Sequence, residues 1–103
     1  MRGEVYQLRR PRDAQGHEQQ GARYAVVVQA SYLATSTWIV APTSTSARPT
    51  SYRPEVEVRG KTTRVLVEQV AAVDTNRLGD LVGTLSLADM QAIDQALRDV
   101  LDL

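Results

Sequence analysis

At residues 24–30 the chain reads Tyr24-Ala25-Val26-Val27-Val28-Gln29-Ala30, a continuous apolar run in a sequence of 103 residues. A run rich in β-branched valine, bounded by polar residues, predicts a buried strand. We expect this strand to lie at the centre of a sheet, because only a central strand can bury so many consecutive apolar side chains.

Shorter apolar runs on both sides of this strand predict further strands. They alternate with segments rich in Gly, Pro, Ser and Thr, which are typical of loops and turns. Loops are expected at 9–22 and 44–52, a turn at Gly60-Lys61 and a turn or single helical turn at 75–79. Strands are expected at 4–8, 36–43, 55–59, 62–70, 71–74 and 81–85.

The last segment has the pattern of a helix. Ser86 and Asp89 fit a capping box, with a serine N-cap and an acidic residue three positions later. Apolar residues then recur at three- and four-residue steps, which places them on one helical face: Met90, Ile93, Leu97, Val100 and Leu101. The pattern predicts a single domain over residues 1–103, mainly β with a C-terminal helix, in which five to seven short strands form a small barrel or sandwich.

The composition restricts the functional classes. No stretch approaches the roughly 18 apolar residues of a membrane helix, there is no cysteine, and the N-terminus lacks an apolar signal region. We therefore expect a cytoplasmic protein without membrane attachment. Ten basic and five acidic residues precede Val65, and eleven of the twelve basic residues are arginine. Arginine-rich segments favour binding to phosphate, as in nucleic-acid ligands.

Several kinds of active site are disfavoured by the residues present. One histidine and no cysteine cannot build a Cys/His metal site, and His17 is the sole histidine available to a serine triad. The acidic residues Glu18, Glu55, Glu57 and Glu68 do not form a recognisable cation-binding loop. We expect neither a metal nor a cofactor.

Five segments resemble the MazF/PemK family, in the order in which that family carries them. The longest runs from Gly16 through Glu18-Gln19, Gly21 and Arg23 into the apolar strand. The others are Arg2-Gly3-Glu4-Val5-Tyr6, Val40-Ala41-Pro42-Thr43-Ser44, Leu66-Val67-Glu68-Gln69-Val70 and Asp74-Thr75-Asn76-Arg77-Leu78. Each match is short, but together they cover nearly the whole chain in the right order.

The resemblance implies both a fold and an activity. Members of the family have an SH3-like barrel with packed helices and work as homodimers. They are toxins of toxin–antitoxin pairs that cleave single-stranded RNA without a metal, leaving a 2′,3′-cyclic phosphate and a 5′-hydroxyl. An acidic antitoxin tail fills the RNA groove and silences them. We therefore expect an antitoxin partner for this chain too.

The resemblance also implies site residues. Arg23 matches the catalytic arginine of the family and Thr43 its threonine, which would stabilise the charge on the phosphate oxygens. The positions expected to contact RNA are Arg9, Arg10, His17, Glu18, Gln19, Ser44, Glu68 and Gln69. Two residues depart from the family pattern. Tyr24 replaces a proline, which restores a backbone N–H, and His17 replaces a small polar residue. With a pKa near 6.5, a histidine can serve as base or acid, or simply lie exposed in the loop.

Other functions remain open at this point. A DNA gyrase poison of the CcdB type shares the fold without a nuclease site. A third hypothesis is an SH3-like binding module, and a fourth is a metal-dependent nuclease. The charge pattern predicts a basic groove for the RNA or the antitoxin tail, lined by Arg9, Arg10, Arg12, Arg23, Arg48 and Arg53.

Overall fold

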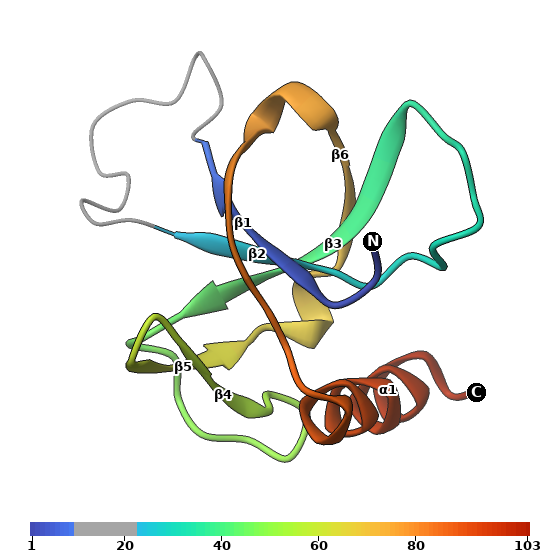
Figure 1. The fold of residues 1–103 in the computed structure, drawn as a ribbon. Helices are drawn as coiled ribbons and strands as arrows, with labels where there is room; N and C mark the ends of the chain where they lie inside the picture. The colour runs from blue at the N-terminus through green and yellow to red at the C-terminus, as the bar shows by residue number, and fades with distance from the viewer. Residues whose placement is uncertain (10–22) are drawn as a thin grey trace, which may run out of the picture.

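In the computed structural model, which describes residues 1–9 and 23–103, seven antiparallel strands form a curled sheet with one α-helix against it (Figure 1). The strands run in the order β4-β5-β3-β2-β1-β7, and β6 pairs with β3. Their bounds are β1 Glu4–Leu8, β2 Tyr24–Val27, β3 Thr37–Ser44, β4 Glu55–Val58, β5 Lys61–Val65, β6 Ala71–Asp74 and β7 Leu78–Thr84. The prediction of a mainly β fold with five to seven strands and a C-terminal helix is confirmed.

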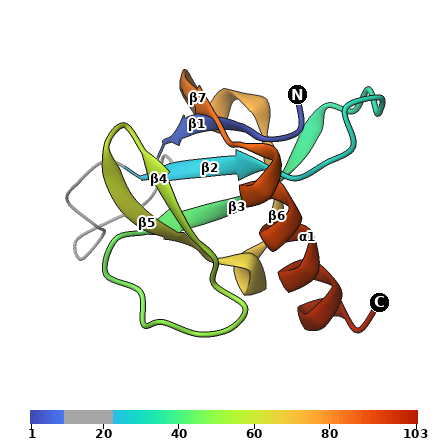
Figure 2. The same cartoon turned by 60° about the horizontal axis from the view of Figure 1, so that its bottom comes forward.

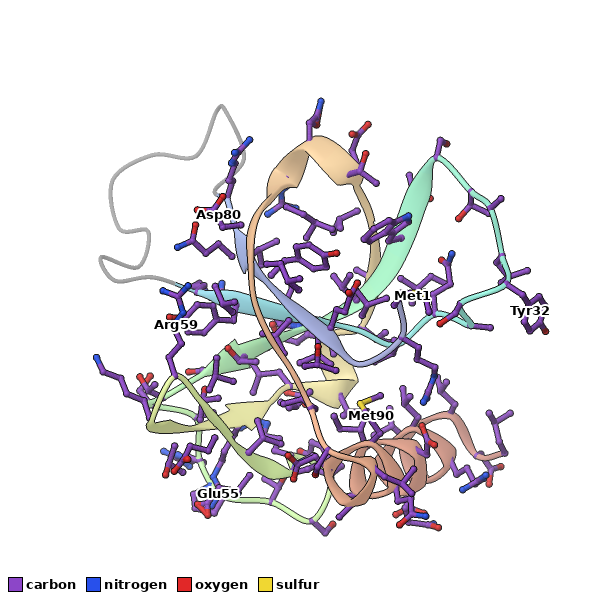
Figure 3. All side chains as sticks on the ribbon, in the orientation of Figure 1. Met1, Tyr32, Glu55, Arg59, Asp80 and Met90 are labelled. Carbon is purple, nitrogen blue, oxygen red and sulfur yellow. The ribbon has the colours of Figure 1, made fainter. Side chains whose placement is uncertain are left out.

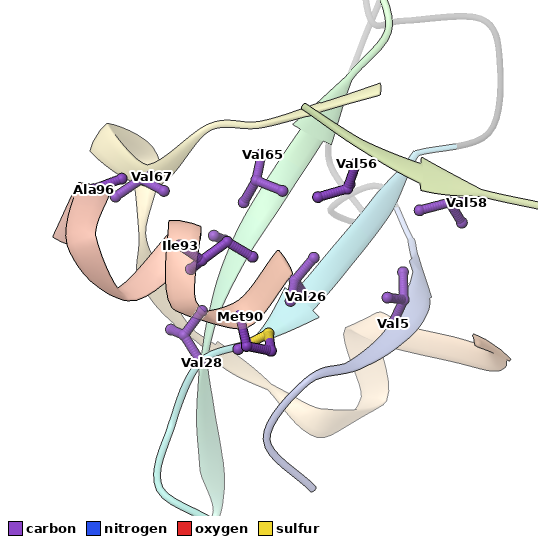
Figure 4. Packing of buried hydrophobic residues seen from close by; sticks show 11 residues of the cluster. Val5, Val26, Val28, Val56, Val58, Val65, Val67, Met90, Ile93 and Ala96 are labelled. Carbon is purple, nitrogen blue, oxygen red and sulfur yellow. The ribbon is translucent and has the colours of Figure 1, made fainter. Parts of the chain in front are cut away.

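The central strand β2 separates two apolar clusters, which explains its continuous apolar sequence. Val26 joins the cluster that packs against the helix α1 (Leu87–Leu101) and the β4–β5 hairpin. Val27 and Ala25 belong to the second cluster, on the opposite face, where the curled sheet closes around them. Figures 1 and 2 place α1 and the hairpin on the same side of β1–β3, and Figure 4 shows Met90 and Ile93 of the helix beside Val26.

The strand β2 ends at Val27, although the apolar run predicted a strand as far as Ala30. Beyond Val27 the ladder becomes irregular, because the carbonyl of Ile39 accepts from the amides of both Val28 and Gln29. The buried side chain of Gln29 then takes the place of a backbone partner, and its Oε1 accepts from the Ile39 amide at 3.1 Å. The ladder therefore ends with a side-chain amide.

The predicted strand at 62–70 is wrong in its second half, where the structure has the 3₁₀ helix η1 (Val67–Gln69). Both β5 and β6 pair with the same edge of β3, β5 near Thr43 and β6 near Val40. Between them lies Pro42, which has no N–H to donate, so its carbonyl accepts from Leu66 without a reciprocal bond. The ladder breaks there, and η1 carries Val67 into the core.

Two turns differ in detail from the sequence prediction. The hairpin turn is Arg59-Gly60, not Gly60-Lys61, since Val58 pairs with Lys61. Both central residues have positive φ, 51° and 77°, which is the twist that two-residue hairpins require. The expected turn at 75–79 contains the 3₁₀ helix η2 (Thr75–Arg77), and β7 begins directly after it.

The helix α1 begins where its cap predicts. The Ser86 hydroxyl accepts from the Asp89 amide at 3.1 Å. Its buried positions are Met90, Ile93 and Ala96. The predicted apolar face included Val100 and Leu101, but these are 37% and 52% exposed because the last turn of the helix is not covered by the sheet. No helix within the described residues is both long and apolar enough to cross a membrane.

Replacing Ile93 by alanine tests the packing of α1 on the sheet. Ile93 is fully buried, so the change should lower the free energy of unfolding by about 2–5 kcal/mol through lost burial and a residual cavity. Leu87→Ala in the same helix is the matched control, because Leu87 is 75% exposed and its loss should cost no more than about 0.5 kcal/mol. Urea denaturation measures both; equal effects would contradict the packing.

Candidate active site

Arg23 lies at the start of the central strand, with its guanidinium partly inside the molecule. The Arg23 carbonyl accepts from the Leu8 amide at 2.9 Å, so the β1–β2 ladder holds its backbone. Its Nε is buried and has no hydrogen-bond partner among the described residues. A buried donor without a partner carries a desolvation cost that an anionic ligand can remove. Arg23 is therefore a candidate anion-binding side chain.

The register of β2 and β3 decides which hydroxyl lies on the face of Arg23. Ala25 pairs with Pro42, so continuing the ladder by two residues places Arg23 opposite Ser44. Partners in an antiparallel ladder share a face, and neighbours along a strand alternate. Ser44 therefore lies on the face of Arg23, and Thr43 lies on the opposite face.

Thr43 faces the core that packs against α1. It is 3% exposed, and its Oγ1 donates to the Tyr24 carbonyl at 3.4 Å. Its ladder partner Val65 belongs to the same core. Thr43, predicted to act with Arg23 at the centre of the site, is thus a buried side chain whose hydroxyl bonds the carbonyl of the residue after Arg23.

A row of polar side chains crosses the sheet from Arg23. Ser44 pairs with Arg64 of β5, and Arg64 pairs with Glu55 of β4. The Arg64 Nη2 lies 3.8 Å from a carboxylate oxygen of Glu55, which is half exposed. Figure 3 labels Glu55 at the end of the β4–β5 hairpin away from the turn residue Arg59. The row therefore joins four strands and carries two arginines. Arg64 was not among the site residues predicted from the sequence. Its position between Thr63 and Val65 in an alternating strand does predict that its side chain points away from the core.

Two more arginines lie at the same end of the sheet. Arg9 follows Leu8, whose amide bonds the Arg23 carbonyl, and the Arg9 Nη1 donates to the Asn76 carbonyl at 3.3 Å. The Arg77 guanidinium in turn donates to the Arg9 carbonyl through Nε and Nη2. Neither guanidinium has a carboxylate partner among the described residues, so both add to a positive potential beside Arg23.

Glu68 and Arg53 form the strongest ion pair near this face. Glu68, on η1, accepts two hydrogen bonds at its Oε2, from the Arg53 Nε at 3.0 Å and Nη2 at 2.6 Å. These bonds lower the pKa of Glu68 against the opposing effect of burial, and they raise the pKa of Arg53. Arg53 is thus not a free cation of a basic groove, and one oxygen of Glu68 is fully engaged.

The remaining predicted site residues fall into two groups. Gln69 is exposed at the end of η1, and Ser44 Oγ accepts from the Ser46 amide at 3.2 Å. Arg10, Arg12, His17, Glu18 and Gln19 lie outside the described residues. Within residues 1–9 and 23–103, no group of three or more His, Asp or Glu side chains gathers as a metal site would require.

Comparison with known proteins assigns the chain to a family. Residues 1–101 match the family described as PemK-like, MazF-like toxin of type II toxin-antitoxin system. The chain belongs to this toxin family. It is 40% identical to the candidate toxin Rv3098A of Mycobacterium tuberculosis (strain ATCC 25618 / H37Rv), over 100% of this chain and 98% of the relative.

Solved structures share the fold of this MazF-like toxin. An endoribonuclease in complex with its cognate antitoxin, from a mycobacterial species, has a TM-score of 0.78 and 22% identity, covering 100% of this chain and 95% of that one. A MazE-MazF structure from Deinococcus radiodurans has a TM-score of 0.80 and 20% identity, covering 98% and 94%. The expected MazF-like fold class is therefore confirmed.

The ion pair predicts how the stability of this MazF-like toxin depends on pH. Because Arg53 lowers the pKa of Glu68 below its ordinary 4.5, the pair stabilises the fold fully above that value and loses this effect as pH falls through the lowered pKa. The wild type should exceed Glu68→Gln in unfolding free energy by a constant amount from pH 7 to about 5.5, and by progressively less towards about pH 3.

Urea denaturation at several pH values measures this difference. Glu57→Gln is the matched control, since Glu57 is exposed on β4 and has no ion pair among the described residues. The unfolding free energy of Glu57→Gln should stay close to that of the wild type at every pH. If the wild type and Glu68→Gln differ in unfolding free energy by as much at about pH 3 as at pH 7, the stabilisation does not come from the ionised Glu68.

Proposed function

We propose that this toxin is an endoribonuclease that cuts single-stranded RNA without a metal, with Arg23 and Ser44 contacting the scissile phosphate. What carries the proposal is the register of β2 and β3, which, continued beyond the pair of Ala25 and Pro42, puts these two residues on one face where β2 begins and β3 ends. Arg23 offers a buried Nε that has no partner in residues 1–9 and 23–103, and Ser44 adds a hydroxyl from the adjacent strand. The endoribonuclease of similar fold supports the same activity.

The proposed chemistry uses the RNA itself as the nucleophile. The 2′-hydroxyl attacks the adjacent phosphorus, and the 5′-oxygen of the next nucleotide leaves, which yields a 2′,3′-cyclic phosphate and a 5′-hydroxyl. The transition state places extra negative charge on the non-bridging oxygens. A guanidinium with several donors in a fixed plane stabilises that charge, and a hydroxyl adds one further donor.

Proton transfer completes the reaction. A guanidinium offers only hydrogen-bond donors and no acceptor, so a group other than Arg23 must remove the 2′-hydroxyl proton. Glu18 and His17 remain the predicted candidates for this step, since the sequence places them five and six residues before Arg23 and both side chain types can accept a proton. Arg9 and Arg77 would bind the flanking phosphates, because they extend the positive charge away from Arg23 and neither pairs with a carboxylate of the described residues.

The proposed partners follow from the same charges. We expect an antitoxin with an acidic tail to occupy the arginine-lined face, as carboxylates bind arginine in the geometry that phosphates do. The MazE-MazF structure and the endoribonuclease–antitoxin complex support an antitoxin partner. The proposed active form is a homodimer acting in the cytoplasm.

Removing Arg23 tests the activity. Purified wild type should cut a long unstructured RNA in excess chelator, and the fragments should end in cyclic phosphate. Arg23→Ala should lower kcat by about 1,000-fold, because the main charge on the transition state is left unstabilised. Arg98→Ala on α1 is the control and should leave kcat unchanged. If the wild type binds RNA or gyrase but never cuts RNA, the proposed activity is wrong.

Comparing the two neighbouring hydroxyls tests which one acts on the phosphate. Ser44→Ala should lower kcat by about 100-fold through loss of a transition-state hydrogen bond. Thr43→Val keeps the shape of the core and removes only the bond to the Tyr24 carbonyl, so it should cost about 1 kcal/mol of stability and little kcat. The reverse pattern in RNA cleavage would assign the chemistry to Thr43.

A further inference from the structure

The connection between β3 and β4, residues 45–54, begins beside the proposed site and contains no helix or strand. It starts directly after Ser44 and carries Arg48, an exposed side chain whose guanidinium has no hydrogen bond or ion pair among the described residues. A ten-residue connection of this kind has many alternative conformations unless specific contacts remove them. Those contacts decide where Arg48 lies relative to Arg23.

Arg53 makes most of these contacts. Its Nη1 donates to the Arg48 carbonyl at 3.3 Å, so one guanidinium closes the connection on itself. Its Nε and Nη2 bind Glu68 Oε2, which fastens the connection to η1. Its guanidinium also lies 5.7 Å from the ring centroid of Tyr52, which packs against the core.

The backbone of Arg53 is tied to the polar row that crosses the sheet. The Arg64 Nη1 donates to the Arg53 carbonyl at 3.0 Å, and Arg64 is the ladder partner of Ser44. Next along the chain, the Pro54 carbonyl accepts from the Val65 amide at 2.9 Å. The end of the connection is therefore anchored on β5, the strand that pairs with Ser44 of β3.

In the part of the chain that the structure describes, the Glu68 carboxylate bonds only to Arg53. Its second oxygen, Oε1, is buried without a hydrogen bond among the described residues. The side chains of Arg53 and Glu68 are only 21% and 26% exposed, so solvent screens their attraction less than it would screen a surface pair. Removing either partner leaves the other charge partly buried and unpaired.

We infer that Glu68 is a positioning residue, which acts through Arg53 to hold residues 45–54 so that Arg48 meets a backbone phosphate of the RNA. This inference rests on the proposed ribonuclease function. It changes the part assigned to two residues: Glu68 does not contact the RNA, and Arg53 binds a carboxylate of its own chain. The RNA contact of this segment is Arg48.

The experiment is a double-variant cycle with two independent readouts. Glu68→Gln, Arg53→Gln and the double variant are compared with the wild type, and Glu57→Gln serves as the matched charge control. Amide hydrogen exchange of residues 45–53 reports whether the connection is held, in the absence of RNA. The second readout is kcat and KM of every variant, measured on a single-stranded RNA oligonucleotide that the wild type cuts, and it reports on RNA binding and cleavage at the site.

Each single variant should speed exchange in the connection about tenfold, while the amides of β2 and β3 stay unchanged. Each should raise KM about tenfold with kcat nearly constant, since a displaced Arg48 weakens binding and leaves Arg23 in place. The double variant should be no worse than either single variant, because both remove the same bridge. Arg53→Lys keeps the charge and should recover part of the KM loss.

Two results would overturn the inference. One is unchanged exchange in Glu68→Gln. The other is a fall in kcat for Glu68→Gln that adds to the effect of Arg53→Gln, which would mean that Glu68 touches the RNA. A wild type that fails to cut RNA overturns the proposed function instead, and the exchange comparison still decides whether the bridge holds the connection.

Discussion

The register between β2 and β3 is the constraint on which the rest of this structure depends. Ala25 pairs with Pro42, and this one pairing places Val26 and Ala41 in the core under α1. A slip of one residue would turn every side chain of one strand to the other face. Because both faces of β2 are buried, such a slip would exchange side chains of different shape between the two apolar clusters, and close packing in both clusters opposes that exchange. The site depends on the same pairing, since it decides that Ser44 rather than Thr43 shares the face of Arg23.

Charge is distributed unevenly among the arginines on this face. Arg53 is neutralised by Glu68, and Arg64 lies near Glu55, so these two arginines serve the framework. Arg9, Arg23 and Arg77 have no carboxylate partner among the described residues, and two of them bond only to backbone carbonyls. Like charges held together are unfavourable in the absence of an anion. That unfavourable energy is recovered when a polyanion binds, which agrees with the proposed binding of RNA or of an acidic antitoxin tail.

Local patterns predicted the elements but not their relations. The Ser86 cap and the three- and four-residue spacing after it were sufficient for α1, because capping and amphipathicity are local properties. The break at η1 was not predictable in this way. Leu66 and Val67 continue the apolar character of the strand before them, whereas the ladder breaks opposite Pro42, a residue 25 positions before Val67 that has no N–H to donate. The choice between Thr43 and Ser44 is equally non-local, since adjacent hydroxyls are distinguished only by the strand opposite them.

The candidate site combines one rigid part and one conditionally ordered part. Arg23 and Ser44 sit at the ends of strands whose backbone is held by ladder bonds, so their separation changes only if the sheet itself distorts. Arg48 sits on a connection without regular structure, and its place depends on contacts made by a single guanidinium. Chemistry at the phosphate demands fixed donors, whereas recognition of the flanking RNA tolerates adjustment. This difference follows from the fold. The backbone of a residue on a strand is fixed by the ladder bonds and the packed core, whereas a residue on a connection is fixed only by the contacts that the connection itself makes.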